Sequence, residues 1–477
     1  MDRPRGTLRT RVLHVTPECA PMTKTGGLGD VSQALPEALR AAGVDALTLL
    51  PGYPAVLDHV GKAREAAKLA LLGFDCRLLR ADPFLVLDCP ALYVRDGGPY
   101  QRADGGDWDD NPLRFGVLAR AAALLGGSGT PLDWRPHVLH CHDWPAGLAP
   151  VYLRGEPGRA ASVMTIHNVA FQGNYDPALL SRLELPPSAY SIDGVEFHGR
   201  LSFLKGGIAY ADAVTTVSPT YAQEIQTPEL GFGLDGLLRH RRAVLSGILN
   251  GIDTRTWDPA NDARIVQRYD ARTLELKAAN KAALQKRMGL QPEARVPLLG
   301  MVSRFAHQKG TDLIAASAEE LVAAPAQLAI VGQGERALQE AMAAIAARHP
   351  GRIAVQVAFD EDLAHAIEAG ADLFLMPSRY EPCGLNQMYS QRYGTPPVAR
   401  ATGGLVDTVM DGVTGFLFAE AERAELVAAA RRALAAYADP ARWSSIQRAG
   451  MARDFSWSAA ARRYAALYLG LATATQR

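Results

Sequence analysis

The sequence shows no excess of charge of either sign. Among 477 residues, 50 Lys and Arg balance 50 Asp and Glu. No overall field therefore favours nucleic acid or an anionic membrane surface, and we expect neither as a partner. An anionic ligand would have to be bound by positive side chains gathered at one place.

Cysteine is scarce, and long apolar runs are missing. The five cysteines are widely spaced without a Cys-x-x-Cys pair, which is typical of reduced thiols rather than of a disulfide framework or a zinc site. No apolar stretch approaches the roughly 20 residues that span a bilayer. The apolar run after the basic residues 1–10, Val12-Leu13, is too short for a signal peptide. These absences predict a soluble, cytoplasmic protein.

Apolar runs of strand length alternate with helical stretches in two successive series. The first series of predicted strands occupies residues 11–16, 46–50, 84–87, 138–140, 162–166 and 213–217. The second occupies residues 298–302, 328–331, 353–357, 373–376 and 397–399. This alternation predicts an α/β protein with two doubly wound sheets. We place the domains at residues 1–245 and 246–456, followed by a last amphipathic helix at 457–477.

The most informative segment is residues 378–385, SRYEPCGL. It directly follows an apolar run typical of a buried parallel strand, and Gly384 opens a helical stretch. Glu381 is therefore expected at the carboxyl end of a strand, beside the N–H groups of a helix start. Ligands bind at this edge of an open α/β sheet, and a helix N-terminus favours an anion such as phosphate. A second glycine-led helix start follows at Thr402-Gly403-Gly404.

Positive side chains and a glycine loop are expected at the same kind of edge. Arg304 and Lys309 follow the predicted strand 298–302, where a guanidinium can hold two phosphate oxygens. Lys24 precedes Gly26 and Gly27 in a loop that allows a ligand to approach the backbone closely. Together they predict a cleft for a phosphorylated sugar. From position alone, each of them is equally compatible with a solvated side chain or a plain turn.

These segments resemble the bacterial glycogen synthase and plant starch synthase family of retaining glycosyltransferases. Similar stretches follow in family order from about Val12 to Asp407: HCHDW at 140–144, TIHN at 165–168, KGG at 205–207, TVSPTY at 216–221, NGID at 250–253, SR at 303–304 and QKG at 308–310. The resemblance implies the GT-B fold, in which two Rossmann-like domains face each other across a cleft and the last helix packs back on the first domain. Tyr389 stands where many other transferases of this architecture carry a second Glu after Glu381, as the glycogen and starch synthases do.

The resemblance also implies roles for individual residues. Glu381 would be the catalytic carboxylate, and His167 would contact the sugar whose anomeric carbon becomes oxocarbenium-like. Arg304 and Lys309 would stabilise the leaving diphosphate. Phe359 would stack on the nucleobase, with a core Phe as the alternative. Substrate contacts are expected from Lys24, Gly26, Gly27, Asp30, Asp143, Asn168, Asn250, Phe359, Cys383, Gly384, Leu385, Thr402, Gly403 and Gly404.

We expect neither a metal nor a cofactor. His140 and His142 flank Cys141, but no further ligand is visible at a suitable spacing. Asp107 and Asp109 match the Asp-x-Asp pattern of metal-dependent glycosyltransferases, yet we interpret them as structural because they lie in a polar loop without periodicity.

The expected activity is that of a hexosyltransferase that moves glucose from ADP-glucose to the non-reducing end of an α-1,4-glucan, with retention. A related transferase with a small acceptor such as glucose 1-phosphate fits the motifs equally well. A non-catalytic glucan-binding protein is the alternative from another class. Binding alone, however, would not require the full set of Lys24, His167, Arg304, Lys309 and Glu381. With one carboxylate securely placed, a front-side reaction is favoured over a double displacement, which needs two carboxylates about 5 Å apart.

Overall fold

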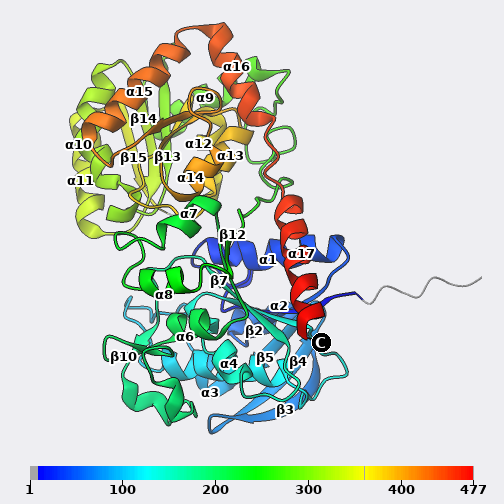
Figure 1. Ribbon diagram of the computed structural model, residues 1–477. Coiled ribbons are helices and arrows are strands. Elements are labelled where there is room, and N and C mark those ends of the chain that lie inside the picture. Colours follow the sequence, from blue (N-terminus) through cyan, green and yellow to red (C-terminus); the bar gives the residue numbers. More distant parts are fainter. Residues whose placement is uncertain (1–8, 359, 476–477) are drawn as a thin grey trace, which may run out of the picture. The chain divides into compact units, whose positions relative to one another are not determined.

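The computed structural model describes residues 9–358 and 360–475 and divides the chain into two compact units (Figure 1). Unit 1 runs to Gly251 and resumes at Trp457, and unit 2 runs from Ile252 to Ser456. The boundary falls after Gly251 rather than at residue 245, because strand β12 (Leu245–Gly247) pairs with β11 (Ala213–Thr216) in the sheet of unit 1. Within the described ranges, no helix combines the length and the apolar character needed to cross a bilayer.

Unit 1 is built on a nine-stranded sheet with the order β12-β11-β7-β6-β1-β2-β5-β4-β3. The strands from β12 to β5 pair in parallel. Apart from β12, nearly all of their residues are buried, which explains why they read as continuous apolar runs in the sequence. Besides β11 and β12, this parallel set consists of β1 (Arg11–Val15), β2 (Asp45–Pro51), β5 (Phe84–Asp88), β6 (Val138–His142) and β7 (Ala161–Ile166).

An antiparallel hairpin, β3 (Arg64–Leu71) and β4 (Phe74–Ala81), extends one edge of this sheet and is absent from the predicted strand series. Charged residues such as Lys68 and Arg77 interrupt its apolar pattern, and many of its side chains are exposed. It therefore offers no continuous apolar run to mark it. A separate three-stranded sheet consists of β8 (Asn174–Tyr175), β10 (Arg200–Ser202) and β9 (Glu196–Phe197).

Two helices from opposite ends of the chain pack against each other in unit 1, α1 (Gly27–Ala41) and α17 (Trp457–Thr475) (Figure 1). Apolar side chains repeat along each at helical spacing and share one core with β1, β6 and β7. The last helix thus completes the core of the unit that the start of the chain begins. The other helices of unit 1 are α2 (Pro54–Val60), α3 (Pro90–Tyr93), α4 (Asn111–Gly126), α5 (Ala149–Leu153), α6 (Phe203–Tyr210), α7 (Pro219–Glu224) and α8 (Asp235–His240).

Unit 2 contains a six-stranded sheet with the order β15-β14-β13-β16-β17-β18, and all of these pairings are parallel. The strands are β13 (Leu298–Val302), β14 (Gln327–Gly332), β15 (Ile353–Val357), β16 (Leu373–Met376), β17 (Pro397–Arg400) and β18 (Phe416–Phe418). The helices are α9 (Lys277–Met288), α10 (Thr311–Ala323), α11 (Arg336–Arg348), α12 (Glu361–Gly370), α13 (Asn386–Arg392), α14 (Gly403–Thr408), α15 (Arg423–Tyr437) and α16 (Pro440–Met451).

Each sheet reverses its strand order next to its first strand. In unit 1 the chain runs outward from β1 to β2 and β5, then returns to place β6 on the other side of β1. In unit 2 it runs from β13 to β14 and β15, then returns to place β16 on the other side of β13. Ligands of doubly wound sheets bind at the carboxyl ends of the strands beside such a reversal. The residues that follow β1 and β6, and those that follow β13 and β16, are therefore the candidates for function.

Candidate active site

The loop after β1 carries the predicted Lys24, Gly26 and Gly27 to the start of α1. Gly26 precedes the helix with an extended backbone, and no side chain caps the first turn. The N–H of Gly29 donates to the carbonyl of Gly26, so among the described residues the N–H groups of Gly27 and Leu28 are the ones left for an anion. Lys24 Nζ lies 2.8 Å from Asp30 Oδ1, and both side chains are partly exposed. The predicted lysine, glycines and Asp30 therefore lie together at the carboxyl end of β1.

Glu18, a buried acid that was not predicted as a site residue, holds this glycine loop in place. Its Oε2 accepts hydrogen bonds from the N–H of Thr25 at 2.6 Å and of Gly26 at 3.3 Å. Its Oε1 accepts a hydrogen bond from the hydroxyl of Tyr100 at 2.5 Å. Burial raises the pKa of Glu18, although these hydrogen bonds act in the opposite direction. Tyr100 belongs to the polar loop that carries Asp107 and Asp109, and this contact ties that loop to the end of β1.

Asp143, directly after β6, bridges the ends of two neighbouring strands. Its Oδ1 accepts hydrogen bonds from the N–H of His167 at 2.7 Å and of Asn168 at 3.4 Å, just beyond β7. Its φ of 54° with ψ of −177° lies in a region that side chains rarely adopt, and such strain costs about 1–3 kcal/mol. Burial raises the pKa of Asp143 to about 7. The side chain thus positions His167, and a sugar contact by Asp143 remains a prediction.

Histidines from β1 and β6 lie behind His167 in the interior of unit 1. His142 Nδ1 lies 3.0 Å from His167 Nε2, and His142 Nε2 lies 3.0 Å from His14 Nδ1. Burial lowers the pKa of His14 and of His167 to about 3, and that of His142 well below its usual value. These rings are therefore neutral at physiological pH. His14 was not predicted as a site residue, although a polar residue inside an apolar strand can indicate a functional position.

His14, His140 and His142 lie close enough together to suggest a metal site. However, both ring nitrogens of His140 are engaged, Nδ1 with the Tyr468 hydroxyl at 2.6 Å and Nε2 with Thr165 Oγ1 at 2.5 Å. Both nitrogens of His142 and one of His14 also have hydrogen-bond partners. Of the six ring nitrogens of these three histidines, His14 Nε2 is the one without a partner among the described residues. A metal would have to displace this network, and the interpretation of His140 and His142 as non-ligating stays a prediction.

In unit 2, Glu381 follows β16 as a buried carboxylate with two polar partners. Lys309 Nζ lies 2.6 Å from its Oε2, and the Ser378 hydroxyl donates to the same oxygen at 3.0 Å. Lys309 follows β13, so this ion pair joins the two strands at the reversal of the sheet. Arg304, also after β13, is exposed and forms no ion pair within the described part of the chain. The predicted carboxylate and both predicted cations thus lie at the same sheet edge.

The two glycine-led turns of unit 2 touch each other through their backbones. The N–H of Gly404 donates to the carbonyl of Glu381 at 3.1 Å. A Cβ at Gly404 would lie 2.0 Å from the carbonyl oxygen of Cys383, so only glycine fits there. Gly384 has a φ of 68°, in the left-handed region that favours glycine. Residues 383–385 and 402–404 are therefore adjacent, as their common role predicts.

Asn250 and Phe359 complete the predicted contact residues. Asn250 is buried just beyond β12 in unit 1. Phe359, expected to stack on a nucleobase, lies outside the described residues, so its role stays a prediction.

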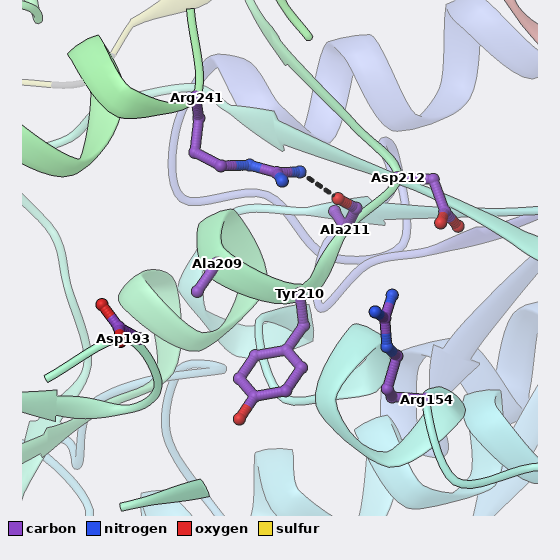
Figure 2. Close-up of a pocket in the computed structure, with 7 residues that line it drawn as sticks. All are labelled: Arg154, Asp193, Ala209, Tyr210, Ala211, Asp212 and Arg241. Atoms are coloured by element: carbon purple, nitrogen blue, oxygen red, sulfur yellow. Dashed lines mark hydrogen bonds between the residues drawn. The ribbon is translucent and has the colours of Figure 1, made fainter. Parts of the chain in front are cut away.

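A cavity shown in Figure 2 lies elsewhere in unit 1, with Arg154, Asp212 and Arg241 in its wall. Arg241 donates a hydrogen bond to the carbonyl of Ala211. The Asp212 carboxylate is engaged by the Arg159 guanidinium at 2.7 and 2.8 Å. Asp212 directly precedes β11, so the cavity lies at the amino end of that strand, and none of the predicted site residues lines it.

Two family models match the chain, one in each unit. The model described as starch synthase catalytic domain matches residues 11–240, and the model described as glycosyl transferases group 1 matches residues 285–449. Among curated relatives, a glycogen synthase of Aromatoleum aromaticum is 53% identical over 491 aligned residues, which cover 99% of each chain. A glycogen synthase of Nitrosomonas eutropha is 50% identical over 479, which cover 96% of this chain and 95% of its own.

Solved structures are similar over nearly the whole chain. The catalytic domain of starch synthase IV from Arabidopsis thaliana, bound to ADP and acarbose, has a TM-score of 0.85 and 32% identity, and the match covers 98% of this chain and 100% of that chain. A sucrose-phosphate synthase from Thermosynechococcus elongatus has a TM-score of 0.62 and 19% identity over 98% of this chain and 100% of its own, a likeness of fold alone. The predicted fold class, two Rossmann-like α/β domains of the GT-B type, is confirmed.

The raised pKa of Asp143 predicts a specific pH dependence of stability. An unfolded chain loses this proton near pH 3.8, whereas the folded protein keeps it up to about pH 7. The stability that comes from this group is therefore fully present below pH 3.8 and is lost as the pH rises through about 7. We expect Asp143→Asn to remove this dependence, which amounts to at most about 4 kcal/mol. Urea denaturation between pH 4 and 8 would measure it.

The matched control is Asp58→Asn, which replaces an exposed carboxylate of the same unit. In this control, the free energy of unfolding should change with pH as steeply as it does in the unmodified protein. If Asp143→Asn shows the same slope as well, Asp143 titrates as an ordinary carboxylate and the burial argument is wrong.

Proposed function

The chain belongs to the glycogen synthase and starch synthase family of glycosyltransferases, and we propose that it transfers glucose from ADP-glucose to the non-reducing end of an α-1,4-glucan with retention of configuration. The observation that carries this proposal is the buried Glu381, paired with Lys309 at the reversal of the unit 2 sheet. The guanidinium of Arg304, which forms no ion pair among the described residues, lies at the same sheet edge. The names of the relatives and the ADP and acarbose bound to the Arabidopsis domain support a nucleotide-sugar donor and a glucan acceptor.

The cations of unit 2 fit the departure of a diphosphate. As the bond between the glucose and the phosphate breaks, negative charge grows on the leaving ADP. Arg304 and Lys309 would stabilise that charge more in the transition state than in the bound donor. The backbone turns at residues 383–385 and 402–404 would bring N–H groups to the same donor. No bound cofactor or metal is part of this proposal, since the two side chains supply the positive charge.

Glu381 would stabilise the positive charge that develops on the anomeric carbon. The carboxylate is 5% exposed and shares Oε2 with Lys309 and Ser378, so its orientation is set before a substrate binds. In the front-side reaction that we propose, the C1–O bond to phosphate breaks and a bond from the acceptor hydroxyl to C1 forms on the same face. The acceptor proton passes to a phosphate oxygen of the departing ADP. This route needs one carboxylate rather than two.

Unit 1 would bind the sugar. His167 and Asn168 follow β7 and are partly exposed, while Asp143 holds the N–H of each. His167 would contact a hydroxyl of the transferred glucose, and Lys24 with the first turn of α1 would bind an anionic group of the donor. Asn250 and Asp30 are further proposed contacts.

The activity can be tested directly with purified protein. We expect glucose transfer from ADP-glucose to glycogen, with weaker transfer from UDP-glucose, and no loss of activity in EDTA. Radiolabelled donor with glycogen, with glucose 1-phosphate or without acceptor would separate the possible acceptors. Transfer to glucose 1-phosphate but not to glycogen would replace the proposed acceptor. Loss in EDTA that manganese restores would instead indicate a metal at Asp107 and Asp109.

Replacing Glu381 by Gln should impair the chemical step. The amide keeps the size of the side chain but removes the charge that opposes the developing cation, and loss of one such interaction costs about 10²- to 10³-fold in kcat. Glu420→Gln, which changes an exposed carboxylate of the same unit, is the matched control. Near-normal turnover of the Glu381→Gln protein would show that the carboxylate is not catalytic.

Replacing Arg304 by Ala should lower kcat as well as donor affinity, because the phosphate charge that it meets grows in the transition state. Steady-state kinetics with varied ADP-glucose would measure both. The control is Arg295→Ala, an exposed arginine that precedes β13 and so lies away from its carboxyl end. A rise in KM with unchanged kcat would mean that Arg304 binds the donor and the transition state equally.

A further inference from the structure

Three histidines of unit 1 form a hydrogen-bonded line that leads from the core to His167. Nδ1 of His14 meets Nε2 of His142 at 3.0 Å, and Nδ1 of His142 meets Nε2 of His167 at 3.0 Å. The ring planes differ by 17° in the first pair and by 37° in the second. His14 and His142 are fully buried, whereas His167 is partly exposed at the end of the line. The line therefore has one end in the core and the other at the proposed sugar site.

The strand register explains how the line forms. β1 and β6 are adjacent and parallel, with His14 opposite His140, and β6 and β7 are adjacent with His142 opposite Thr165. Because side chains alternate along a strand, His140 and His142 point to the same face of the sheet. His140 uses its own nitrogens for Tyr468 and Thr165 and takes no part in the line. The line is thus unbranched.

The proton positions in this line are linked. Burial keeps all three rings neutral, so each ring carries one N–H and one lone pair. Each of the two hydrogen bonds needs one donor and one acceptor. Only two arrangements meet both conditions: either every ring is protonated on Nδ1, or every ring is protonated on Nε2.

The buried end of the line selects between the two arrangements. His14 Nε2 has no hydrogen-bond partner among the described residues. Protonation on Nε2 would leave a buried N–H without an acceptor, whereas protonation on Nδ1 leaves only a lone pair there. Orphaned buried N–H groups are rarer in proteins than acceptors that are not fully satisfied. The arrangement with every ring protonated on Nδ1 is therefore favoured.

We propose that His142, itself oriented by His14, is a positioning residue that holds His167 as its Nδ1–H tautomer. In the described part of the chain, no hydrogen bond reaches Nδ1 of His167. His167 would thus offer the substrate a hydrogen-bond donor and no acceptor. Given the proposed function, the sugar oxygen that it meets must accept this hydrogen bond, and the imidazole takes no proton from the acceptor hydroxyl.

Nitrogen NMR of the intact protein tests the tautomer without any assay of activity. In protein labelled with 15N-histidine, long-range proton–nitrogen correlations distinguish Nδ1–H from Nε2–H rings, and single substitutions assign the signals of the 11 histidines. We expect Nδ1–H for His14, His142 and His167. An Nε2–H ring at His167, or a mixture of both tautomers, would overturn the proposal. So would one equivalent of a transition metal that binds these rings and shifts their signals.

A pair of variants of the same size tests the role of His142. The amide of His142→Asn can donate a hydrogen bond from the place of Nδ1, whereas the ionised carboxylate of His142→Asp can only accept one. The Asp variant should therefore put a proton on Nε2 of His167, and the Asn variant should not. We expect kcat of the Asp variant to be about three- to tenfold below that of the Asn variant, as for one hydrogen bond. His240→Asn, an exposed histidine of the same unit, is the control.

The outcomes separate this proposal from the proposed function. Equal kcat and equal His167 tautomers in the Asp and Asn variants would overturn the positioning role. If neither variant folds, the tautomers of the unmodified protein still decide. If the protein transfers no glucose from any donor, the proposed function fails, but the NMR result continues to test the tautomer.

Discussion

Parallel strands can pair only if the chain crosses over between them, and this constraint arranges both units. Each crossover brings the carboxyl end of the next strand to the same edge of the sheet. Residues far apart in sequence therefore meet within each unit. Asp143 after β6 reaches the N–H of His167 after β7, and Lys309 after β13 reaches Glu381 after β16. The chemistry that we propose uses side chains that this topology places together.

Three acids are buried at these sheet edges. A buried carboxylate is unfavourable unless hydrogen bonds or a cation compensate for its lost hydration. Glu18 meets this need with the backbone of the glycine loop, Asp143 with the backbone beyond β7, and Glu381 with Lys309 and Ser378. In each case the partner is a loop or side chain of the proposed site. The same contacts that satisfy the acids fix the site before a ligand arrives, which lowers the free-energy cost of ordering it upon binding.

Much of the fold was predictable because buried parallel strands leave continuous apolar runs in the sequence. The start of α14 at Gly403 was also predicted. The hairpin β3–β4 leaves no such run, and the short β12 crosses the predicted boundary at residue 245. Glu18 was missed for a different reason. Its partner Tyr100 is 82 positions away in a loop without periodicity, so the contact depends on tertiary structure alone. Likewise, strand register places His14 opposite His140 and thus within reach of His142 two residues further along β6, and local sequence does not reveal this register.

Unit 1 is discontinuous, since α17 joins its core only after the whole of unit 2 has been passed along the chain. During synthesis, the ribosome releases α1 and the strands beside it long before Tyr464 and Tyr468 exist. The apolar side chains that later contact α17 stay exposed to solvent while about two hundred further residues, Ile252 to Ser456, are added. A product that ends early would keep this surface open permanently. Helix α17 therefore supplies cover that this part of the unit 1 core lacks until its residues have been made.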